Sequence, residues 1–574
     1  MPKGRRRKPL PGSTSSVESR VAQPSPIREP LNGSGSPAAG YWYYAGLGLL
    51  LLLTLLAYHR TFTAGFLRWD DQFYVTENPL LSTADGLRKI WDVRARATQQ
   101  YYPLTFSSFW LEYRLWGFDA RGYHAVNVVL HLINTALVAG VLRALGLSPV
   151  ATLFGAGVFA LHPAQVASVA WIAERKNVLA GVFCFLCLWA FCRHLARSTL
   201  ASYTASWFAF VAALLAKTQV VGLPLSLFTL TWLGVGKQEA RRPGTLANVV
   251  EVGLLLLPFV VVALLLAVVT VGYEQAAWTP AFSFVERLLV STNALVFYLR
   301  TVLWPVGLSP IYPQWQIDPA QPGWWFAPVL VAALFAGAAW WRERIPGLVW
   351  WGTAHFLVML LPVVGIVSFN FFTYSFVADH FLYFSLLGAA AALGALVDVA
   401  RKLSGAGTRW LALAGLLLGL AGLSYRETFH WQDNLTFWLR VQQRDPNGFL
   451  GAYNLGNHYR QTGEWELAAR WYERAAAIRP RADYAFRRYA EAVRRARGPE
   501  AALAVSDGKL RSLPNFPAAL VEKGIALEEL GKVEEAREAY KRALALSQAG
   551  SALQREAAAR LGSLATAAPR RDGS

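Results

Sequence analysis

The chain is poor in cysteine and in charged residues. Only three of its 574 residues are cysteine, and Cys184, Cys187 and Cys192 all lie in one apolar run. This placement excludes a disulfide-stapled secreted fold and a cysteine-ligated metal site, and it predicts thiols buried in lipid. Charged residues make up 16% of the chain and hydrophobic residues 54%. A chain this long and this apolar is not a soluble multidomain protein, so we expect an integral membrane protein with many spans.

The charge that is present is unevenly placed. There are 55 Lys and Arg residues against 36 Asp and Glu, a net charge of +19, and much of the excess lies near the N-terminus and in short loops between apolar runs. Basic loops beside spans indicate topology before they indicate a ligand. Residues 1–40 are basic and rich in Ser, Pro and Gly, which predicts a disordered cytoplasmic tail. The uncharged run 41–58 opens with aromatic residues and lacks a convincing cleavage site, so it predicts a retained first span.

Apolar runs predict eleven spans within residues 41–425. After the first, they lie near residues 123–142, 150–171, 177–193, 203–219, 220–236, 247–271, 324–341, 347–367, 381–400 and 408–425. With this count, every cluster of Arg and Lys between the runs falls on the cytoplasmic side. The longest loop before the last span, 59–122, then lies on the outer face.

Residues 287–306 test this count. The segment is nearly apolar enough for a twelfth span, but it contains Arg287, Asn293 and Arg300, and a single crossing would place the later basic clusters outside. We therefore predict an interfacial or re-entrant segment on the outer face. The N-terminus is then cytoplasmic and all residues after 425 are extracytoplasmic. The high Ala, Arg and Gly content favours a bacterial inner membrane and periplasm.

Residues 426–574 contain a repeat of 34 residues. Small residues recur at this period at Gly456, Ala490 and Gly524, and again at Ala468, Ala502 and Ala536. An aromatic residue two periods apart and a proline at the end of the unit complete the tetratricopeptide pattern. We predict an α-solenoid of three helical hairpins over about 449–548 and a final capping helix, looser at the middle repeat because Ser506 replaces the aromatic residue. Its concave surface suits an extended peptide or a partner helix, and a rigid stalk without a ligand is the alternative.

Polar residues that could support chemistry cluster in the predicted outer loops. Loop 59–122 opens with Trp69-Asp70-Asp71, and two carboxylates so close to a span are costly unless they are solvated or used. The end of the third span and the loop that follows it contain His162-Pro163 and then Glu174-Arg175-Lys176. A solvated acidic turn and ordinary loop charges paired with one another are the alternatives to a functional site.

Four separated motifs carry a resemblance to a known family. They are Trp69-Asp70-Asp71 with Asn78-Pro79, His162-Pro163 to Glu174-Arg175-Lys176, Leu303-Trp304-Pro305 with Tyr312-Pro313, and Ser375-Phe376-Val377-Ala378-Asp379-His380. Together with the order of modules over roughly residues 40–550, they resemble the transmembrane and tetratricopeptide-repeat protein O-mannosyltransferases and their bacterial relatives. These belong to the GT-C glycosyltransferases. The resemblance implies an all-α polytopic bundle of GT-C type followed by the repeats. It also implies transfer of a sugar, mannose in the animal members, from a polyprenyl-phosphate carrier to Ser or Thr hydroxyls of exported proteins.

The resemblance assigns roles to the candidate residues. Transfer needs a base for the acceptor hydroxyl and a cation for the departing phosphate, and displacement by one nucleophile inverts the anomeric centre. By family position we favour Asp70 as the base, with Asp71 as its orienting neighbour or as the base itself. The donor phosphate is expected on Arg175, Lys176 and His162, and the cleft wall is expected to contain Asp379, His380 and Glu174. For each histidine, a capping or core role is the alternative, and for Asp379 a structural ion pair.

No cofactor is expected other than the polyprenyl-phosphate sugar as donor substrate. No His, Asp or Glu spacing demands a metal, and the need for a divalent ion stays open. Expected partners are the lipid-linked donor in the membrane and an exported acceptor protein, with presentation by the repeats as one expected route and with no nucleic acid. Two other functions stay open. The same transferase fold would serve a cell-envelope glycan or lipid as acceptor, and a catalytically silent scaffold would recruit exported proteins through its repeats.

Overall fold

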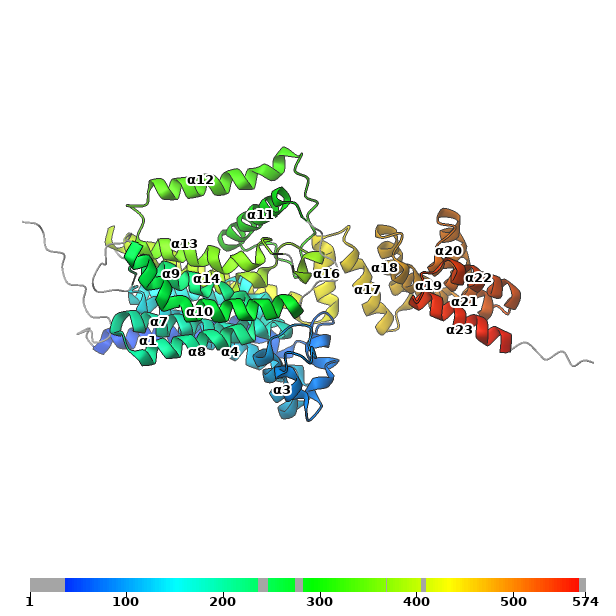
Figure 1. Ribbon diagram of the computed structural model, residues 1–574, viewed down its shortest axis with the longest axis horizontal. Helices are drawn as coiled ribbons and strands as arrows, with labels where there is room; N and C mark the ends of the chain where they lie inside the picture. The colour runs from blue at the N-terminus through cyan, green and yellow to red at the C-terminus, as the bar shows by residue number, and fades with distance from the viewer. Residues whose placement is uncertain (1–36, 236–245, 274–281, 368, 404–408, 567–574) are drawn as a thin grey trace, which may run out of the picture.

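The computed structural model describes residues 37–235, 246–273, 282–367, 369–403 and 409–566. All regular secondary structure in these ranges is helical (Figure 1). One body is a bundle of long apolar helices, and a second body of short helical hairpins follows it along the chain. The predicted all-α class, a membrane bundle followed by tetratricopeptide repeats, is confirmed.

Each of the eleven predicted spans coincides with a helix or a pair of helices. In chain order these are α1 (Pro37–Tyr58), α4 (Ala120–Ala144), α5 (Pro149–Leu161) with α6 (Val166–Ala170), α7 (Arg175–Arg197), α8 (Leu200–Ala216), α9 (Leu223–Trp232), α10 (Leu246–Tyr273), α12 (Phe326–Trp340), α13 (Gly347–Leu360), α14 (Leu382–Leu403) and α15 (Arg409–Glu427). Within the described ranges, six helices are long and apolar enough to cross a membrane, or seven if the bent pair around His162 is one span. The exact count of eleven stays a prediction.

Local sequence explains where the bundle helices begin and break. The Ser148 side chain caps the start of α5, and Pro149 occupies the first helical position, where no amide donor is needed. The helix then ends at His162, whose extended backbone precedes Pro163, and the following segment turns by 48°. Most of the segment 287–306 lies in α11 (Phe284–Leu303), which starts with a capping box between Ser283 and Glu286. That helix has 20 residues but is not among the six that are both long and apolar enough to cross a membrane.

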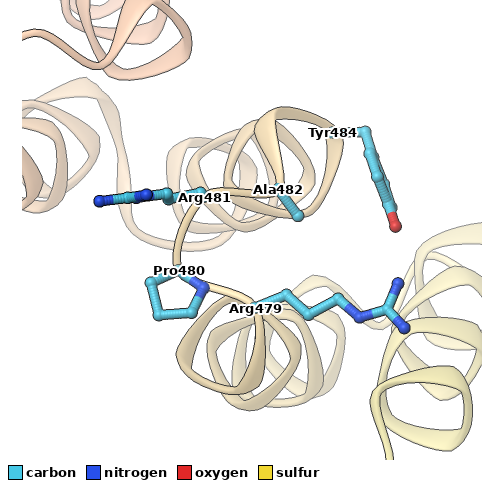
Figure 2. Close-up of a pocket in the computed structure, with 5 residues that line it drawn as sticks. All are labelled: Arg479, Pro480, Arg481, Ala482 and Tyr484. Atoms are coloured by element: carbon cyan, nitrogen blue, oxygen red, sulfur yellow. The ribbon is translucent and has the colours of Figure 1, made fainter.

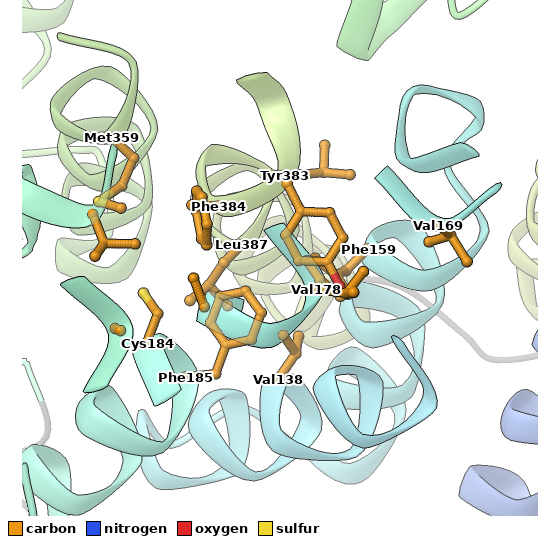
Figure 3. Close-up of a cluster of buried hydrophobic side chains, with 14 of the residues drawn as sticks. Val138, Phe159, Val169, Val178, Cys184, Phe185, Met359, Tyr383, Phe384 and Leu387 are labelled. Atoms are coloured by element: carbon orange, nitrogen blue, oxygen red, sulfur yellow. The ribbon is translucent and has the colours of Figure 1, made fainter. Parts of the chain in front are cut away.

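The core of the bundle is formed by apolar side chains from several helices. Figure 3 shows Phe159, Phe185 and Tyr383 meeting between the helices, with Cys184 beside them. The three cysteines are free thiols and are buried by protein side chains, so they do not face lipid as their apolar run had suggested.

Shorter elements lie at one end of the bundle, opposite the start of α1 (Figure 1). They include α2 (Gly86–Trp91), α3 (Pro103–Trp116) and α16 (Asn434–Arg444). Two hydrogen bonds join the first loop to the region around the start of α16: Gly65 N–H donates to the Gln432 carbonyl at 2.9 Å, and Arg68 N–H donates to the side-chain Oδ1 of Asn434 at 2.6 Å. The first loop is thereby attached to the segment that leads into the repeats.

The repeats are hairpins of paired helices, as predicted. They are α17 (Phe449–Gln461) with α18 (Trp465–Ile478), α19 (Asp483–Arg497) with α20 (Pro499–Ser512), and α21 (Pro517–Glu529) with α22 (Val533–Leu546), followed by α23 (Ala552–Thr566). Gly456 is needed because a Cβ there would lie 2.6 Å from the Tyr472 ring, and the same holds for Gly524 and Tyr540 at 2.4 Å. In the middle hairpin Ser506 is buried, and its hydroxyl has no hydrogen-bond partner in the described ranges.

Candidate active site

The two adjacent aspartates have different environments. Asp71 is fully buried, and its two carboxylate oxygens accept hydrogen bonds from the Leu67 and Ala173 amides, each at 2.8 Å. Burial raises the pKa of Asp71 to about 7, although these two amide contacts oppose the shift. Because both oxygens already have partners, Asp71 joins the turn at residues 67–71 to the segment that precedes α7.

Asp70 presents its carboxylate differently. Its side chain is 34% exposed, and its Oδ2 lies 3.6 Å from the Lys176 ammonium. Burial raises the pKa of Asp70 above its ordinary value, and the Lys176 charge partly opposes this rise. Successive side chains diverge, so the contact of Asp71 with Ala173 leaves Asp70 pointing elsewhere. Asp70 is therefore the more exposed carboxylate of the pair.

Lys176 stands at the centre of a buried network. Its ammonium lies 3.0 Å from Glu174 Oε1 and donates to the Tyr74 hydroxyl at 3.3 Å. Tyr74 belongs to a short π-helical turn, Gln72–Thr76, which follows directly after Asp71. The other Glu174 oxygen lies 3.2 Å from the ammonium of Lys217. Glu174 is thus neutralised from two sides while Lys176 faces Asp70.

Two further groups complete this network. Lys217 also donates to Asn177 Oδ1 at 2.7 Å, and Asn177 donates to the His380 carbonyl at 2.9 Å. His380 Nε2 lies 3.9 Å from Glu174 Oε1. The network therefore joins the start of α7, the end of α8 and the start of α14, and it holds Lys176 in place.

Arg175 lies apart from this network although it precedes Lys176 in the chain. Its guanidinium is fully buried and forms an ion pair with Glu112 of α3. It also donates to Asn127 Oδ1 at 2.5 Å and to the Tyr123 carbonyl at 2.8 Å. Neighbouring positions at a helix start point in different directions, which separates Arg175 from its neighbour. The predicted pair of phosphate-binding cations is therefore divided between two environments.

The remaining predicted residues occupy two further places. His162 accepts from the Ala164 amide through Nδ1 at 3.2 Å and lies 3.2 Å from the Val302 carbonyl through Nε2, so both ring nitrogens have backbone partners. Asp379 accepts from the Tyr312 hydroxyl at 2.8 Å. Of the predicted cleft wall, Glu174 and His380 thus join Lys176 and Asp70, while Asp379 faces Tyr312.

Some residues of the site were not predicted from the sequence. Tyr74, Asn177, Lys217 and Glu112 contact the candidate residues directly. Lys217 carried a usable signal, because an ionisable residue at the end of an apolar run suggests a functional site. Tyr74 and Asn177 carried none. Across the described ranges, no group of three or more His, Cys, Asp or Glu side chains could hold a metal ion.

Comparison with known proteins gives two kinds of match. Tetratricopeptide-repeat models match residues 452–483 and 517–549. Protein O-mannosyl-transferase Tmtc1 of Drosophila melanogaster is 30% identical over 207 residues, which is 34% of this chain and 24% of that protein. Protein O-mannosyl-transferase tmtc2 of Xenopus laevis is 32% identical over 149 residues, 25% of this chain and 18% of that protein. The chain therefore spans about a quarter or less of the length of these relatives.

Two solved structures are also similar at low sequence identity. The Archaeoglobus fulgidus oligosaccharyltransferase tethered with an acceptor peptide has a TM-score of 0.38 and 12% identity, covering 74% of this chain and 58% of that chain. ArnT from Cupriavidus metallidurans bound to undecaprenyl phosphate has a TM-score of 0.33 and 13% identity, covering 88% and 80%. The sequence matches, and not the solved structures, confirm the resemblance predicted from the four motifs. This chain is similar to protein O-mannosyl-transferases and carries tetratricopeptide repeats.

Proposed function

We propose that this chain is a membrane glycosyltransferase that moves a hexose, mannose by analogy with its relatives, from a polyprenyl-phosphate donor to Ser or Thr hydroxyls of exported proteins. The observation that carries the proposal is the contrast between the two aspartates. Asp71 is held by two backbone amides, whereas Asp70 keeps a partly exposed side chain opposite the Lys176 ammonium. A reachable carboxylate facing a fixed cation is what an inverting transfer from a phosphate requires.

The proposed reaction is a single displacement. The acceptor oxygen attacks the anomeric carbon while the Asp70 carboxylate takes the hydroxyl proton. The bond between the anomeric carbon and the phosphate oxygen breaks, and its electron pair leaves with the polyprenyl phosphate. No strong general acid is needed, because phosphate is a weak base as a leaving group. One displacement inverts the anomeric configuration.

Lys176 is the proposed partner of the departing phosphate. The network of Glu174, Lys217 and Asn177 fixes its position, and such preorganised charge stabilises a transition state without reorganisation. We do not extend the phosphate role to Arg175 or His162, because their polar atoms already have protein partners. In this proposal Arg175 stabilises the fold and His162 caps the break that follows α5.

The proposed compartments follow from the two ends of the bundle. Loop 59–122, α16 and the repeats lie at the end opposite the start of α1 (Figure 1). With a basic cytoplasmic tail at residues 1–40, this arrangement supports an outer site in domain 41–425 and an outer repeat domain at 426–574. The lipid donor would enter from the bilayer, and the repeats would bind the acceptor.

The proposal is tested in cells by replacing one carboxylate. The host gene is exchanged for an Asp70→Asn variant, with Asp92→Asn as the matched control, because Asp92 is an exposed aspartate of the same outer loop. Mass spectrometry then compares hexose-bearing glycopeptides of exported proteins. We expect them to disappear with Asp70→Asn and to persist with Asp92→Asn. Unchanged glycopeptides together with a changed envelope glycan would indicate that the acceptor is a glycan or lipid and not a protein. Full function of the Asp70→Asn variant would indicate a scaffold without catalytic activity.

A further inference from the structure

A pocket lies at the turn that joins the first two hairpins of the repeat domain. It has a volume of about 490 Å³ and is lined by Arg479, Pro480, Arg481, Ala482 and Tyr484. Figure 2 shows the Arg479 side chain and the Tyr484 ring on the same side of the turn, with Arg481 extending the opposite way. The pocket thus presents guanidinium groups beside the apolar faces of a proline and a tyrosine.

Aromatic rings from the first hairpin adjoin this pocket. Phe449 and Tyr453 stack at 5.4 Å, and Tyr484 meets them edge-on at 5.8 Å and 5.2 Å. The Arg479 guanidinium lies 4.5 Å from the centre of the Phe449 ring. Tyr484 is still 49% exposed, so these contacts leave about half of its surface available. The ring cluster holds both Arg479 and Tyr484 at the surface.

The charges at the pocket are not compensated within the protein. Over the described ranges Arg479 and Arg481 have no ion-pair partner, whereas Arg487 and Arg497 on the next helix are paired with glutamates. The imbalance extends around the pocket: residues 449–498 contain ten basic and five acidic residues, and residues 499–566 contain nine of each. Positive charge is therefore concentrated on the part of the solenoid that contains the pocket.

The internal repeat supplies a comparison within the same chain. A proline occupies the same place in three successive turns, at Pro446, Pro480 and Pro514. The residues that surround the middle proline differ from their counterparts 34 residues away. Arg479, Arg481 and Tyr484 correspond to Asp445, Asn447 and Leu450 on one side and to Leu513, Asn515 and Ala518 on the other. The neighbouring turns thus pack without two arginines and a tyrosine, so the repeat architecture does not require this set of residues.

We propose that this pocket binds an extended acidic segment of a polypeptide. A carboxylate of the segment pairs with Arg479 or Arg481, and a neighbouring apolar side chain lies on Tyr484 and Pro480. The identification of the segment as part of the glycosyl acceptor rests on the proposed function. The binding itself does not, because it is measured without sugar transfer. The charge of the pocket selects acidic over basic chains, and the aromatic wall favours a carboxylate beside an apolar residue.

The experiment measures peptide binding to the full-length protein in nanodiscs of zwitterionic lipid. Fluorescence anisotropy compares a Ser- and Thr-containing peptide rich in Glu with a peptide in which Gln replaces each Glu. The variants are Arg479→Ala with Arg481→Ala, Tyr484→Ala, and Lys541→Ala with Arg542→Ala. The last pair is the matched control, because it removes the same charge from exposed positions of α22. Unfolding curves select variants that are as stable as the parent.

We expect the acidic peptide to bind at least about tenfold more tightly than the Gln peptide, since a charge-assisted hydrogen bond is worth roughly a factor of ten to a hundred. The double arginine variant loses this preference, Tyr484→Ala weakens both peptides, and the control pair binds like the parent. Equal binding of the two peptides, or parent-like binding by the double arginine variant, would overturn the proposal.

Two further arms separate the possible failures. If anionic vesicles of phosphatidylglycerol bind through Arg479 and Arg481 and the acidic peptide does not, the pocket is a membrane contact and the proposal is wrong. Asp70→Asn should bind the peptide like the parent. Binding without any sugar transfer by the parent would support this site while refuting the proposed enzyme. Transfer without a preference for acidic peptides would refute this site alone.

Discussion

Exchange of Asp70 and of Asp71 for asparagine, one at a time, separates the proposed catalytic role from the structural role. Asp70→Asn removes the proposed base. The side-chain contact that it weakens is the partly exposed one with Lys176, so we expect little change in the free energy of unfolding. A positioned general base typically increases the rate of a reaction by about 10²- to 10⁴-fold, so we expect kcat/KM for sugar transfer to fall by that factor. The protein should still fold and bind its lipid donor.

Asp71→Asn should have the opposite profile. The asparagine keeps one acceptor oxygen, but its NH₂ group would face the Leu67 or Ala173 amide that now donates to Asp71. Loss of a buried, charge-assisted hydrogen bond costs about 1.5–3 kcal/mol, so we expect a lower midpoint of thermal unfolding. Transfer per folded molecule should remain within about tenfold of the parent.

The assay measures transfer of labelled sugar from a polyprenyl-phosphate donor by purified protein, together with thermal unfolding in the same detergent. If Asp71→Asn abolished transfer at unchanged stability while Asp70→Asn stayed active, the roles assigned to the two carboxylates would be reversed.

Two other predictions concern charges near the site. Lys176→Met removes the cation 3.6 Å from Asp70, so the pKa of Asp70 should rise. Because the base acts only when deprotonated, the acid limb of the pH profile of kcat/KM should move to higher pH by about one to three units. An acid limb that stays in place would show that the two groups are not coupled. Glu112→Gln leaves the buried Arg175 without its counter-charge and should lower the free energy of unfolding by about 3–5 kcal/mol. The double variant Glu112→Leu with Arg175→Leu should recover most of that loss. A double variant that is no more stable than Glu112→Gln would contradict this prediction.

The helices were largely predictable because their signal is local. Length, apolarity and the 34-residue period each lie within one stretch of sequence, and all eleven predicted spans coincide with helices. The break after α5 was not predicted, although Pro163 marks it, because 150–171 is uncharged and mostly apolar and resembles one continuous span. The burial of the cysteines among protein side chains was equally hidden, since a lipid-facing and a core-facing run look alike in composition.

The site was predictable only in part because it joins distant segments. The motifs identified Asp70, Glu174, Lys176 and His380, and the structure brings these four together. Sequence spacing does not say which helices meet, so the contribution of Lys217 and the diversion of Arg175 toward α3 were not predicted. The resemblance favoured Asp70 as the base and kept Asp71 as the alternative, and the hydrogen bonds of Asp71 are what distinguish the environments of the two side chains.

The central requirement is that Asp70 and the repeats share the outer compartment, opposite the basic tail. Labelling with a membrane-impermeant maleimide tests it directly, because Cys184, Cys187 and Cys192 are buried and give little background. Single cysteines are placed at exposed Ala97 in the first loop and Ala549 in the repeats, and at Ser13 in the tail. In intact spheroplasts we expect labelling at positions 97 and 549, and labelling at 13 only after lysis. Labelling of 13 and 549 under the same condition would place the repeats with the tail and contradict the mechanism.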